Sequence, residues 1–98
     1  MAWEIEVHPL VLKEDFRQLP SSEQKFVVRM IRKKLSIDPR AFGKPLTCEF
    51  KGYWRLATGD YRVIYRIVES KVLVSIIKVG IRRDDRVYQE FWNRLRKL

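Results

Sequence analysis

Three arginines, Arg55, Arg62 and Arg82, lie in or next to segments rich in β-branched and aromatic residues. Side chains alternate across a strand, so neighbouring strands can bring these guanidinium groups together on one face of a sheet. Guanidinium groups bind phosphate oxygens through paired hydrogen bonds and keep their charge near neutral pH. The pattern therefore indicates a phosphate-binding surface. The alternative is a solvated face on which the arginines pair with nearby carboxylates.

Most other catalytic arrangements are excluded by residue type. His8 is the only histidine, which argues against a histidine triad or a two-histidine nuclease, and we interpret it as a strand-end or capping residue. No glycine-rich loop matches a phosphate-binding pattern. Asp84 and Asp85 fit a helix cap better than a metal cluster. Cys48 is the only cysteine, so an internal disulfide is impossible and a structural zinc site is not expected. We expect no metal and no cofactor.

The charge of the chain is strongly positive and uneven. Twenty-one Lys and Arg residues against twelve Asp and Glu give a net charge of +9. Residues 1–50 contribute +2 and residues 51–98 contribute +7. Such an excess favours a polyanionic partner, because cationic side chains neutralise phosphates and release counterions. A solvated surface or a contact with an acidic protein would produce the same charge.

Length and composition predict one cytoplasmic domain. The 98 residues fit a single domain covering 1–98. No apolar run approaches the roughly 20 residues needed to span a bilayer, and residues 1–4 do not resemble a signal peptide. The lone cysteine fits a reducing compartment.

The first forty residues predict a strand followed by two helices. Apolar and acidic residues alternate over 3–7, which is typical of a strand with one buried face. A helix beginning at Pro9 is broken at Pro20. Ser21 and Gln24 fit a capping box that opens a second helix, which ends at Asp38-Pro39. Apolar residues recur at helical spacing in both helices: Leu12, Phe16, Leu19, Val27, Met30, Ile31 and Leu35.

The remaining residues predict a loop, three strands and a helix. Residues 40–52 contain Gly43, Pro45 and Gly52 and indicate a loop. Strands over 54–58 and 61–68 flank a Gly59-Asp60 turn, and a third strand covers 72–79 and ends at Gly80. Asp84-Asp85 then caps a helix with an apolar stripe of Tyr88, Phe91, Trp92 and Leu95. The prediction is an α+β fold with an N-terminal strand, a helical hairpin, a three-stranded antiparallel meander and a C-terminal helix.

Two segments resemble a known family. Residues 52–65 read GYWRLATGDYRVIY and residues 79–88 read VGIRRDDRVY, which is similar to the core signature of the RelE/ParE toxin superfamily. Leu19-Pro20, Asp38-Pro39 and 43–46 fall where that family has its helix break, helix end and loop. The resemblance covers nearly the whole chain and implies a RelE-like fold.

The resemblance implies a toxin of a type II toxin–antitoxin pair. RelE-type members cut messenger RNA in the ribosomal A site, whereas ParE-type members share the fold, poison DNA gyrase and generally lack the RNA-cleaving residues. The RelE-type catalytic residues correspond to Arg55, Arg62, Arg82 and Tyr88. The family has another basic residue where this chain has Tyr53, and Lys51 or Lys78 is a candidate to replace it. The candidate RNA-binding residues are Lys44, Lys51, Tyr53, Lys78 and Arg83.

The implied chemistry is attack of a ribose 2′-hydroxyl on the neighbouring phosphate. Arg55 and Arg62 would stabilise negative charge on the phosphorane oxygens, and Arg82 would neutralise the leaving oxygen. Tyr88 would stack on a base, orient the hydroxyl or remove its proton, or else simply pack on the last helix. We expect the ribosome to hold the message in a reactive geometry.

Partners and alternatives follow from the same resemblance. We expect a hetero-oligomer with an acidic, partly disordered antitoxin, and contact with the ribosome and mRNA but not with a membrane. The apolar last helix is either core or part of the antitoxin's docking site. A gyrase-directed toxin without enzymatic activity and a non-catalytic RNA-binding module remain alternatives. The presence of Arg62, Arg82 and Tyr88 favours the nuclease.

Overall fold

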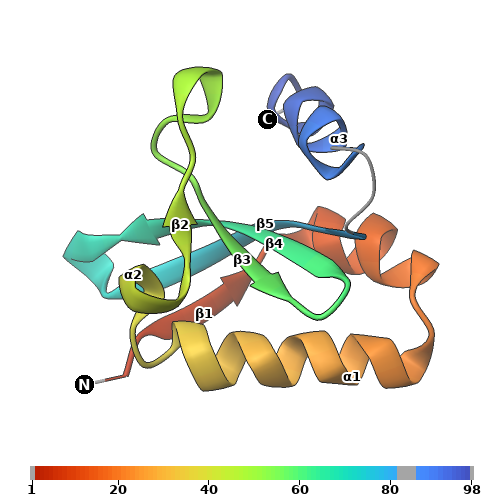
Figure 1. The fold of residues 1–98 in the computed structure, drawn as a ribbon, viewed down its shortest axis with the longest axis horizontal. Helices are drawn as coiled ribbons and strands as arrows, with labels where there is room; N and C mark the ends of the chain where they lie inside the picture. The colour runs from red at the N-terminus through yellow and green to blue at the C-terminus, as the bar shows by residue number, and fades with distance from the viewer. Residues whose placement is uncertain (1, 82–85, 98) are drawn as a thin grey trace.

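A five-stranded sheet with helices on both faces forms the framework of the protein. The computed structural model describes residues 2–81 and 86–97. The strands lie in the order β1-β5-β4-β3-β2. Helix α1 (Ser21–Met30) lies on one face of the sheet and α3 (Arg86–Leu95) on the other (Figure 1). The strand bounds are β1 (Glu4–Val7), β2 (Lys44–Pro45), β3 (Trp54–Thr58), β4 (Tyr61–Val68) and β5 (Leu73–Ile81). The predicted α+β architecture is confirmed.

The sheet is wider than the predicted three-stranded meander. Strand β1 pairs in parallel with β5, and β2 pairs antiparallel with β3. The prediction of a continuous loop over 40–52 was therefore wrong. That segment also contains a short helix, α2 (Pro39–Phe42), and a single 3₁₀ turn, η4 (Cys48–Phe50). Asp38 caps α2, because its carboxylate accepts hydrogen bonds from the backbone N–H groups of residues 40 and 41.

The predicted helical hairpin is present, but its helices are irregular. The first consists of a π-helical turn, η1 (Val11–Asp15), and a 3₁₀ turn, η2 (Phe16–Gln18). The second continues from α1 into another π-helical turn, η3 (Ile31–Leu35). The predicted capping box was wrong, since the side chain of Gln24 instead donates to the carbonyl oxygens of Phe16 (2.6 Å) and Leu19 (2.8 Å). Gln24 thereby ties α1 to the turn before it.

The larger apolar core lies between the sheet and the helical hairpin. Val27, Ile31 and Leu35 recur every four residues and are buried against the sheet. Tyr65 lies in this core, and its hydroxyl donates to the carbonyl oxygen of Pro39 at 2.5 Å. Leu12, which belongs to the predicted apolar stripe, does not join this core, because its side chain is exposed.

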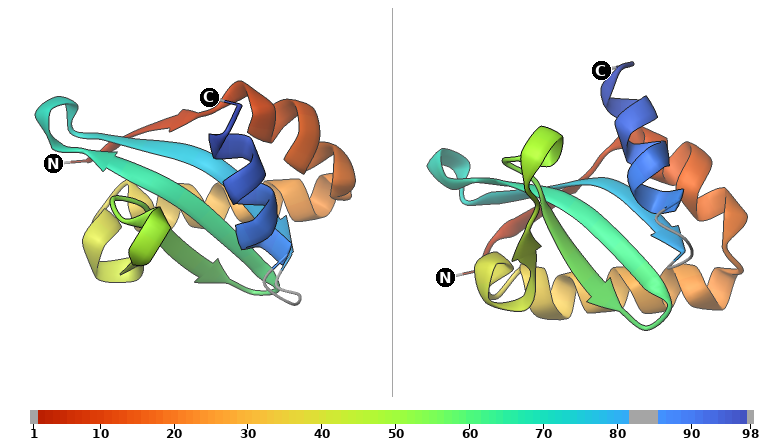
Figure 2. Two further views of the ribbon diagram at one scale, coloured as in Figure 1. Left: turned by 90° about the horizontal axis from the view of Figure 1, so that it is seen from above. Right: turned by 45° about the horizontal axis from the view of Figure 1, so that its top comes forward.

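A smaller apolar core lies beneath α3, on the opposite face. It is built from Ile64, Ile77, Val87 and Phe91, all buried. Figure 2 shows α3 standing over the end of the sheet where β5 runs out. The close approach requires Gly80, because a Cβ there would lie 2.6 Å from Cγ2 of Val87. Glycine thus sets how near α3 comes to the sheet.

Strand β5 carries a bulge that matters for the site. Ile64 lies opposite Lys78, whereas Tyr65 lies opposite Ile76, so Ile77 has no partner across the strand pair. Both Ile77 and Lys78 consequently face α3, where Ile77 packs in the apolar core and Lys78 contacts Glu90.

The strand ends differ slightly from the predictions. Strand β5 starts at Leu73, because Val72 has a left-handed backbone (φ 49°), and it continues past Gly80 to Ile81. Gly59 has φ 56°, as the predicted hairpin turn requires. The predicted Asp84-Asp85 cap lies outside the described residues. Within the described ranges, none of the helices has the length and hydropathy to cross a membrane.

Candidate functional site

Arg55 and Arg62 lie on the face of the sheet that α3 covers. Arg55 is directly opposite Ile64 in the β3–β4 pair, and Ile64 packs in the core beneath α3. Arg62 precedes Ile64 by two residues, so the alternation of the strand places it on the same face. The predicted sharing of one face is therefore observed for these two arginines, and both side chains are half-buried.

Tyr88 connects this face to α3. The Nη1 atom of Arg55 donates to the hydroxyl oxygen of Tyr88 at 3.3 Å. Tyr88 stands in the first turn of α3, and its side chain is half-buried. The contact brings residues 33 positions apart together and uses a single N–H of a guanidinium that has five. The remaining donors of Arg55 leave capacity to bind an anion.

Arg62 lies at the end of the sheet, next to the last residues of β5. Its Nη1 atom donates to the carbonyl oxygen of Tyr61 at 3.1 Å, and it lies opposite Gly80 in the β4–β5 pair. Arg82 and Arg83 follow this point but lie outside the described residues. The convergence of Arg82 with Arg62 stays a prediction, as does the RNA-binding role of Arg83.

An aromatic cluster packs against the ring of Tyr88. Phe50, in η4, has its ring centroid 6.3 Å from that of Tyr88 and 5.4 Å from that of Phe91. The ring of Tyr53 meets Phe91 edge to face at 4.9 Å. The ring of Tyr88 packs in this cluster while its hydroxyl contacts Arg55, so the packing role is observed and the role towards RNA stays a prediction. Trp92 also contacts Phe50 but is 41% exposed, so the last helix is core on one side only.

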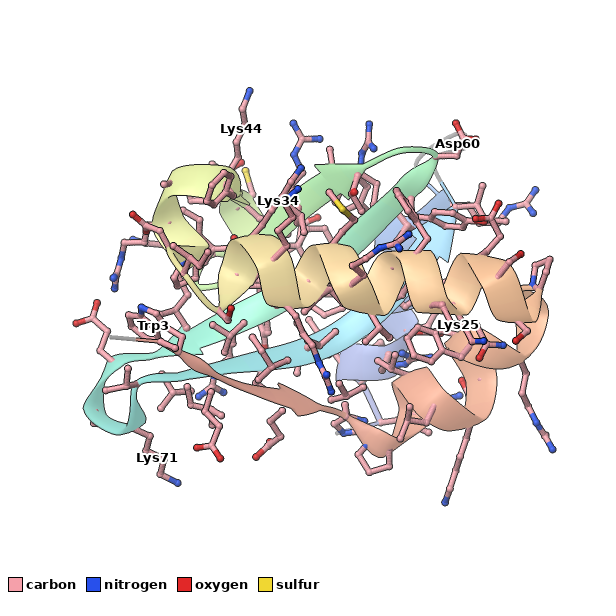
Figure 3. All side chains as sticks on the ribbon, turned by 90° about the horizontal axis from the view of Figure 1, so that it is seen from below. Trp3, Lys25, Lys34, Lys44, Asp60 and Lys71 are labelled. Carbon is pink, nitrogen blue, oxygen red and sulfur yellow. The ribbon has the colours of Figure 1, made fainter. Side chains whose placement is uncertain are left out.

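Two candidate RNA-binding lysines extend the surface outward. Lys44 is exposed on the edge strand β2, directly opposite Arg55, and Figure 3 shows it reaching away from that edge. Lys51 is exposed just after η4. Lys44 and Arg55 put positive charge on this edge of the sheet, and Lys51 lies in the loop that joins β2 to β3.

Lys78 does not belong to this surface, which corrects the expectation that it binds RNA. It is only 5% exposed, and its Nζ atom lies 2.9 Å from Oδ1 of Asp15 and 3.2 Å from Oε1 of Glu90. Two carboxylates neutralise its ammonium group. Its position at the bulge turns it towards α3 and η1 rather than towards solvent.

Lys78 is part of a buried ion-pair cluster of Asp15, Lys78 and Arg94, which sequence reasoning missed. Asp15 and Arg94 are each 4% exposed. The carboxylate of Asp15 accepts hydrogen bonds from both Nη atoms of Arg94, each at 2.8 Å, and from the backbone N–H of Val79 at 2.9 Å. Burial opposes the charge of Arg94, but hydrogen bonds and charge from Asp15 and Glu14 outweigh it and raise the pKa of Arg94.

The spacing of Arg94 in α3 is the feature of the sequence that could have revealed this ion-pair cluster. Val87, Phe91 and Arg94 recur at intervals of four and three residues, so Arg94 lies on the buried stripe of α3. An arginine on an apolar stripe needs a buried partner.

One groove lined by described residues lies away from the candidate site. It runs along α1 on the other face, between Phe16, Val28 and basic side chains of the helix. Within residues 2–81 and 86–97, no three His, Cys, Asp or Glu side chains are grouped so that they could hold a metal ion. Guanidinium and phenol groups are thus the chemistry that the described face presents.

Comparisons with known proteins identify relatives of this chain. Residues 5–86 match the model of a family described as the ParE toxin of the type II toxin–antitoxin system parDE. The chain is 35% identical over 72 residues to Toxin RelG of Mycobacterium tuberculosis, covering 74% of this chain and 83% of that protein. Toxin RelE of the same organism is 32% identical over 68 residues, which is 69% of this chain and 70% of that protein.

Solved structures show the same fold. The toxin–antitoxin complex RelBE2 of Mycobacterium tuberculosis includes a chain that matches with a TM-score of 0.79 and 30% identity, covering 86% of this chain and 95% of that one. A mutant of the E. coli toxin RelE in complex with a peptide of antitoxin RelBc matches with a TM-score of 0.65 and 28% identity, covering 92% and 94%.

Proposed function

Because the chain belongs to the RelE/ParE toxin superfamily and is a RelE-like toxin of a type II toxin–antitoxin system, we propose that it is an endoribonuclease that cleaves mRNA on the ribosome. The observation that carries the proposal is the contact between Arg55 and Tyr88 on the face that also holds Arg62. Cleavage would inhibit translation and would use arginine and tyrosine side chains, without a metal ion.

The proposed reaction is transfer of a phosphate within the RNA. The 2′-oxygen forms a bond to phosphorus while the bond from phosphorus to the 5′-oxygen breaks, leaving a cyclic phosphate and a 5′-hydroxyl. The 2′-hydroxyl loses a proton and the 5′-oxygen gains one. Negative charge collects on the phosphorane oxygens, where Arg55 and Arg62 would stabilise it because their positive charge is fixed in place beforehand. We assign Arg82 to the leaving oxygen.

Tyr88 is proposed to orient the attacking group. Its oxygen accepts a hydrogen bond from Arg55, which leaves its own O–H free to donate to the RNA. The contact also sets the direction of the hydroxyl relative to the guanidinium. We propose that Tyr88 contacts the 2′-hydroxyl or the scissile phosphate, in addition to its packing role.

Ribosome dependence is proposed from the kinds of group at the site. Arginine and tyrosine side chains are inefficient general bases near neutral pH, so cleavage would depend on precise positioning of the RNA. Positioning alone can lower a barrier by about 7–11 kcal/mol. We propose that the ribosome supplies this positioning, and that the protein cuts free RNA slowly.

The remaining candidate residues are assigned to the surface around the catalytic groups. We propose that Lys44, Lys51, Tyr53 and Arg83 bind the RNA backbone or bases around the catalytic groups, as one toxin domain acting in the cytoplasm. The family membership and the solved complexes of relatives support an antitoxin partner. We propose that this partner is acidic, given the net charge of +9, and that the two form a hetero-oligomer.

A gyrase-directed toxin is the second candidate, since the matching family model is that of ParE toxins. In that case the basic face would bind a protein and no RNA would be cut. A module that binds RNA without cleaving it would lose affinity gradually as single residues are changed.

The test maps cleavage of mRNA on programmed ribosomes by the wild type, Arg62→Ala and Arg66→Ala. Arg66 is exposed on the same strand four residues away, so its replacement is a matched control. We expect Arg62→Ala to lower the cleavage rate by about 10²–10³-fold, as for loss of one donor to a developing anion. Arg66→Ala should cleave normally.

Three results would overturn the assignment. Full activity of Arg62→Ala would remove Arg62 from the site. Equal cleavage of free and ribosome-bound mRNA would refute ribosome dependence. Absence of cleavage together with inhibition of gyrase supercoiling would favour the second candidate.

A further inference from the structure

The buried ion-pair cluster of Asp15, Lys78 and Arg94 joins three separate parts of the fold. Asp15 belongs to η1, Lys78 to β5 and Arg94 to α3. Arg94 contacts both carboxylate oxygens of Asp15 and also donates to the carbonyl oxygen of Ile77 at 2.9 Å. That carbonyl lies at the bulge of β5. The guanidinium of Arg94 is thus fixed from two directions.

Helix α3 depends on such contacts for its position. It spans ten residues, and helices shorter than about 12 residues are marginal on their own. Val87 and Phe91 hold it through apolar packing, which has no preferred direction. The hydrogen bonds of Arg94 are directional and therefore restrain sliding and rotation of the helix.

The cluster and the candidate site share this helix. Tyr88 and Arg94 are six residues apart in α3, which corresponds to about 9 Å along the helix axis. Glu90 adds a second link between them, because its carboxylate lies 3.2 Å from the Lys78 ammonium. A shift of α3 that broke the Asp15–Arg94 contact would also move the Tyr88 hydroxyl away from Arg55.

We infer that the buried ion-pair cluster positions Tyr88 against Arg55, so that Arg94 and Asp15 act on cleavage through α3 without touching the RNA. The inference rests on the proposed nuclease function. Buried ion pairs contribute little net stability compared with apolar packing, but their geometry is specific. The cluster is therefore better suited to fixing the place of α3 than to strengthening the core.

The test compares Arg94→Gln with Arg96→Gln in the full-length protein. Arg96 is exposed and follows α3 closely, so it is a matched control. Hydrogen exchange of the α3 amides reports how firmly the helix is held. Ribosome-dependent cleavage gives kcat and KM. We expect Arg94→Gln to speed exchange in α3 and to lower kcat by about 10–100-fold with KM little changed, because the catalytic group is misplaced and not removed.

A double-mutant cycle with Tyr88→Phe separates positioning from a merely structural role. Tyr88→Phe keeps the ring but loses the hydroxyl that Arg55 contacts. If Arg94 acts through that hydroxyl, adding Arg94→Gln to Tyr88→Phe should lower kcat by less than about twofold further. Losses that multiply would overturn the inference, as would full kcat and unchanged α3 exchange in Arg94→Gln.

Two further cases need separate treatment: a variant that does not fold, and a wild type that does not cleave mRNA. If Arg94→Gln does not fold, Arg94→Lys replaces it, since lysine keeps the charge but cannot make the forked contact with Asp15. The same fall in kcat is then expected, and normal kcat would refute the inference. If the wild type cleaves no mRNA, the proposed function fails. The α3 exchange rates then decide whether the cluster holds the helix, and equal rates in Arg94→Gln and Arg96→Gln would refute that too.

Discussion

Replacing Asp15 by alanine should destabilise the protein strongly. The carboxylate is 1% exposed and is the shared acceptor for Lys78, Arg94 and the backbone N–H of Val79. Its removal leaves two buried cations without their common anion and one buried N–H without an acceptor. Breaking a buried ion pair on one side costs about 3–5 kcal/mol, because the remaining charge stays uncompensated. Domains of this size unfold at a cost of about 5–15 kcal/mol, so a third or more of the total can be lost.

Thermal and urea unfolding measure this loss. About 4–8 °C of Tm is expected per kcal/mol for a domain of this size, so Asp15→Ala should lower Tm by at least about 12 °C. Glu14→Ala is the matched control, because Glu14 is the neighbouring carboxylate on Arg94 but is 52% exposed. Removal of the Glu14 carboxylate should lower the free energy of unfolding by at most about 1 kcal/mol.

A milder variant guards against complete unfolding. Asp15→Asn keeps the size of the side chain and one acceptor oxygen but removes the charge. The free energy of unfolding of Asp15→Asn should lie between those of the wild type and Asp15→Ala. Equal stabilities of Asp15→Ala and Glu14→Ala would show that the cluster is solvated and would refute the reasoning from burial.

Three further predictions concern the sheet and its faces. Tyr65→Phe should cost about 1–3 kcal/mol in urea unfolding, because the buried carbonyl of Pro39 loses its donor. Burial, and to a lesser extent the charge of Asp38, raises the pKa of Tyr65, so the folded chain keeps that proton while the unfolded chain begins to lose it near pH 10. Unfolding therefore releases a proton above about pH 10, and stability should fall as pH rises there in the wild type but less steeply in Tyr65→Phe. Gly80→Ala should cost about 1–3 kcal/mol by forcing its Cβ against Val87, and unchanged stability with unchanged α3 amide exchange would show that the helix is not packed tightly there.

The local elements of the fold could be predicted from the sequence. The hairpin around Gly59 and the strands on either side of it follow from β-branched residues and turn chemistry. The long-range pairings could not. Nothing in residues 4–7 specifies β5 as a parallel partner, and Lys44–Pro45 lacks the residue types that favour a strand.

The candidate site shows the same division. Alternation along β4 places Arg62 on the face of Ile64, and the pairing of β3 with β4 places Arg55 on the same face, since both depend only on strand geometry and neighbour pairing. Lys78 was assigned to the wrong surroundings because the identity of its partners depends on where η1 and α3 pack. A charged residue in a strand is usually exposed, and only the tertiary structure reveals the carboxylates that permit its burial.

The contact between Asp15 and Arg94 joins residues 79 positions apart, which has a consequence for synthesis. During translation the sheet can begin to assemble before Arg94 has emerged, but α3 cannot be anchored until it has. Contacts of such long sequence separation form late and slow the overall rate of folding. A nascent chain would therefore pass through a stage in which the sheet has formed but α3, and with it Tyr88, is not yet fixed in place.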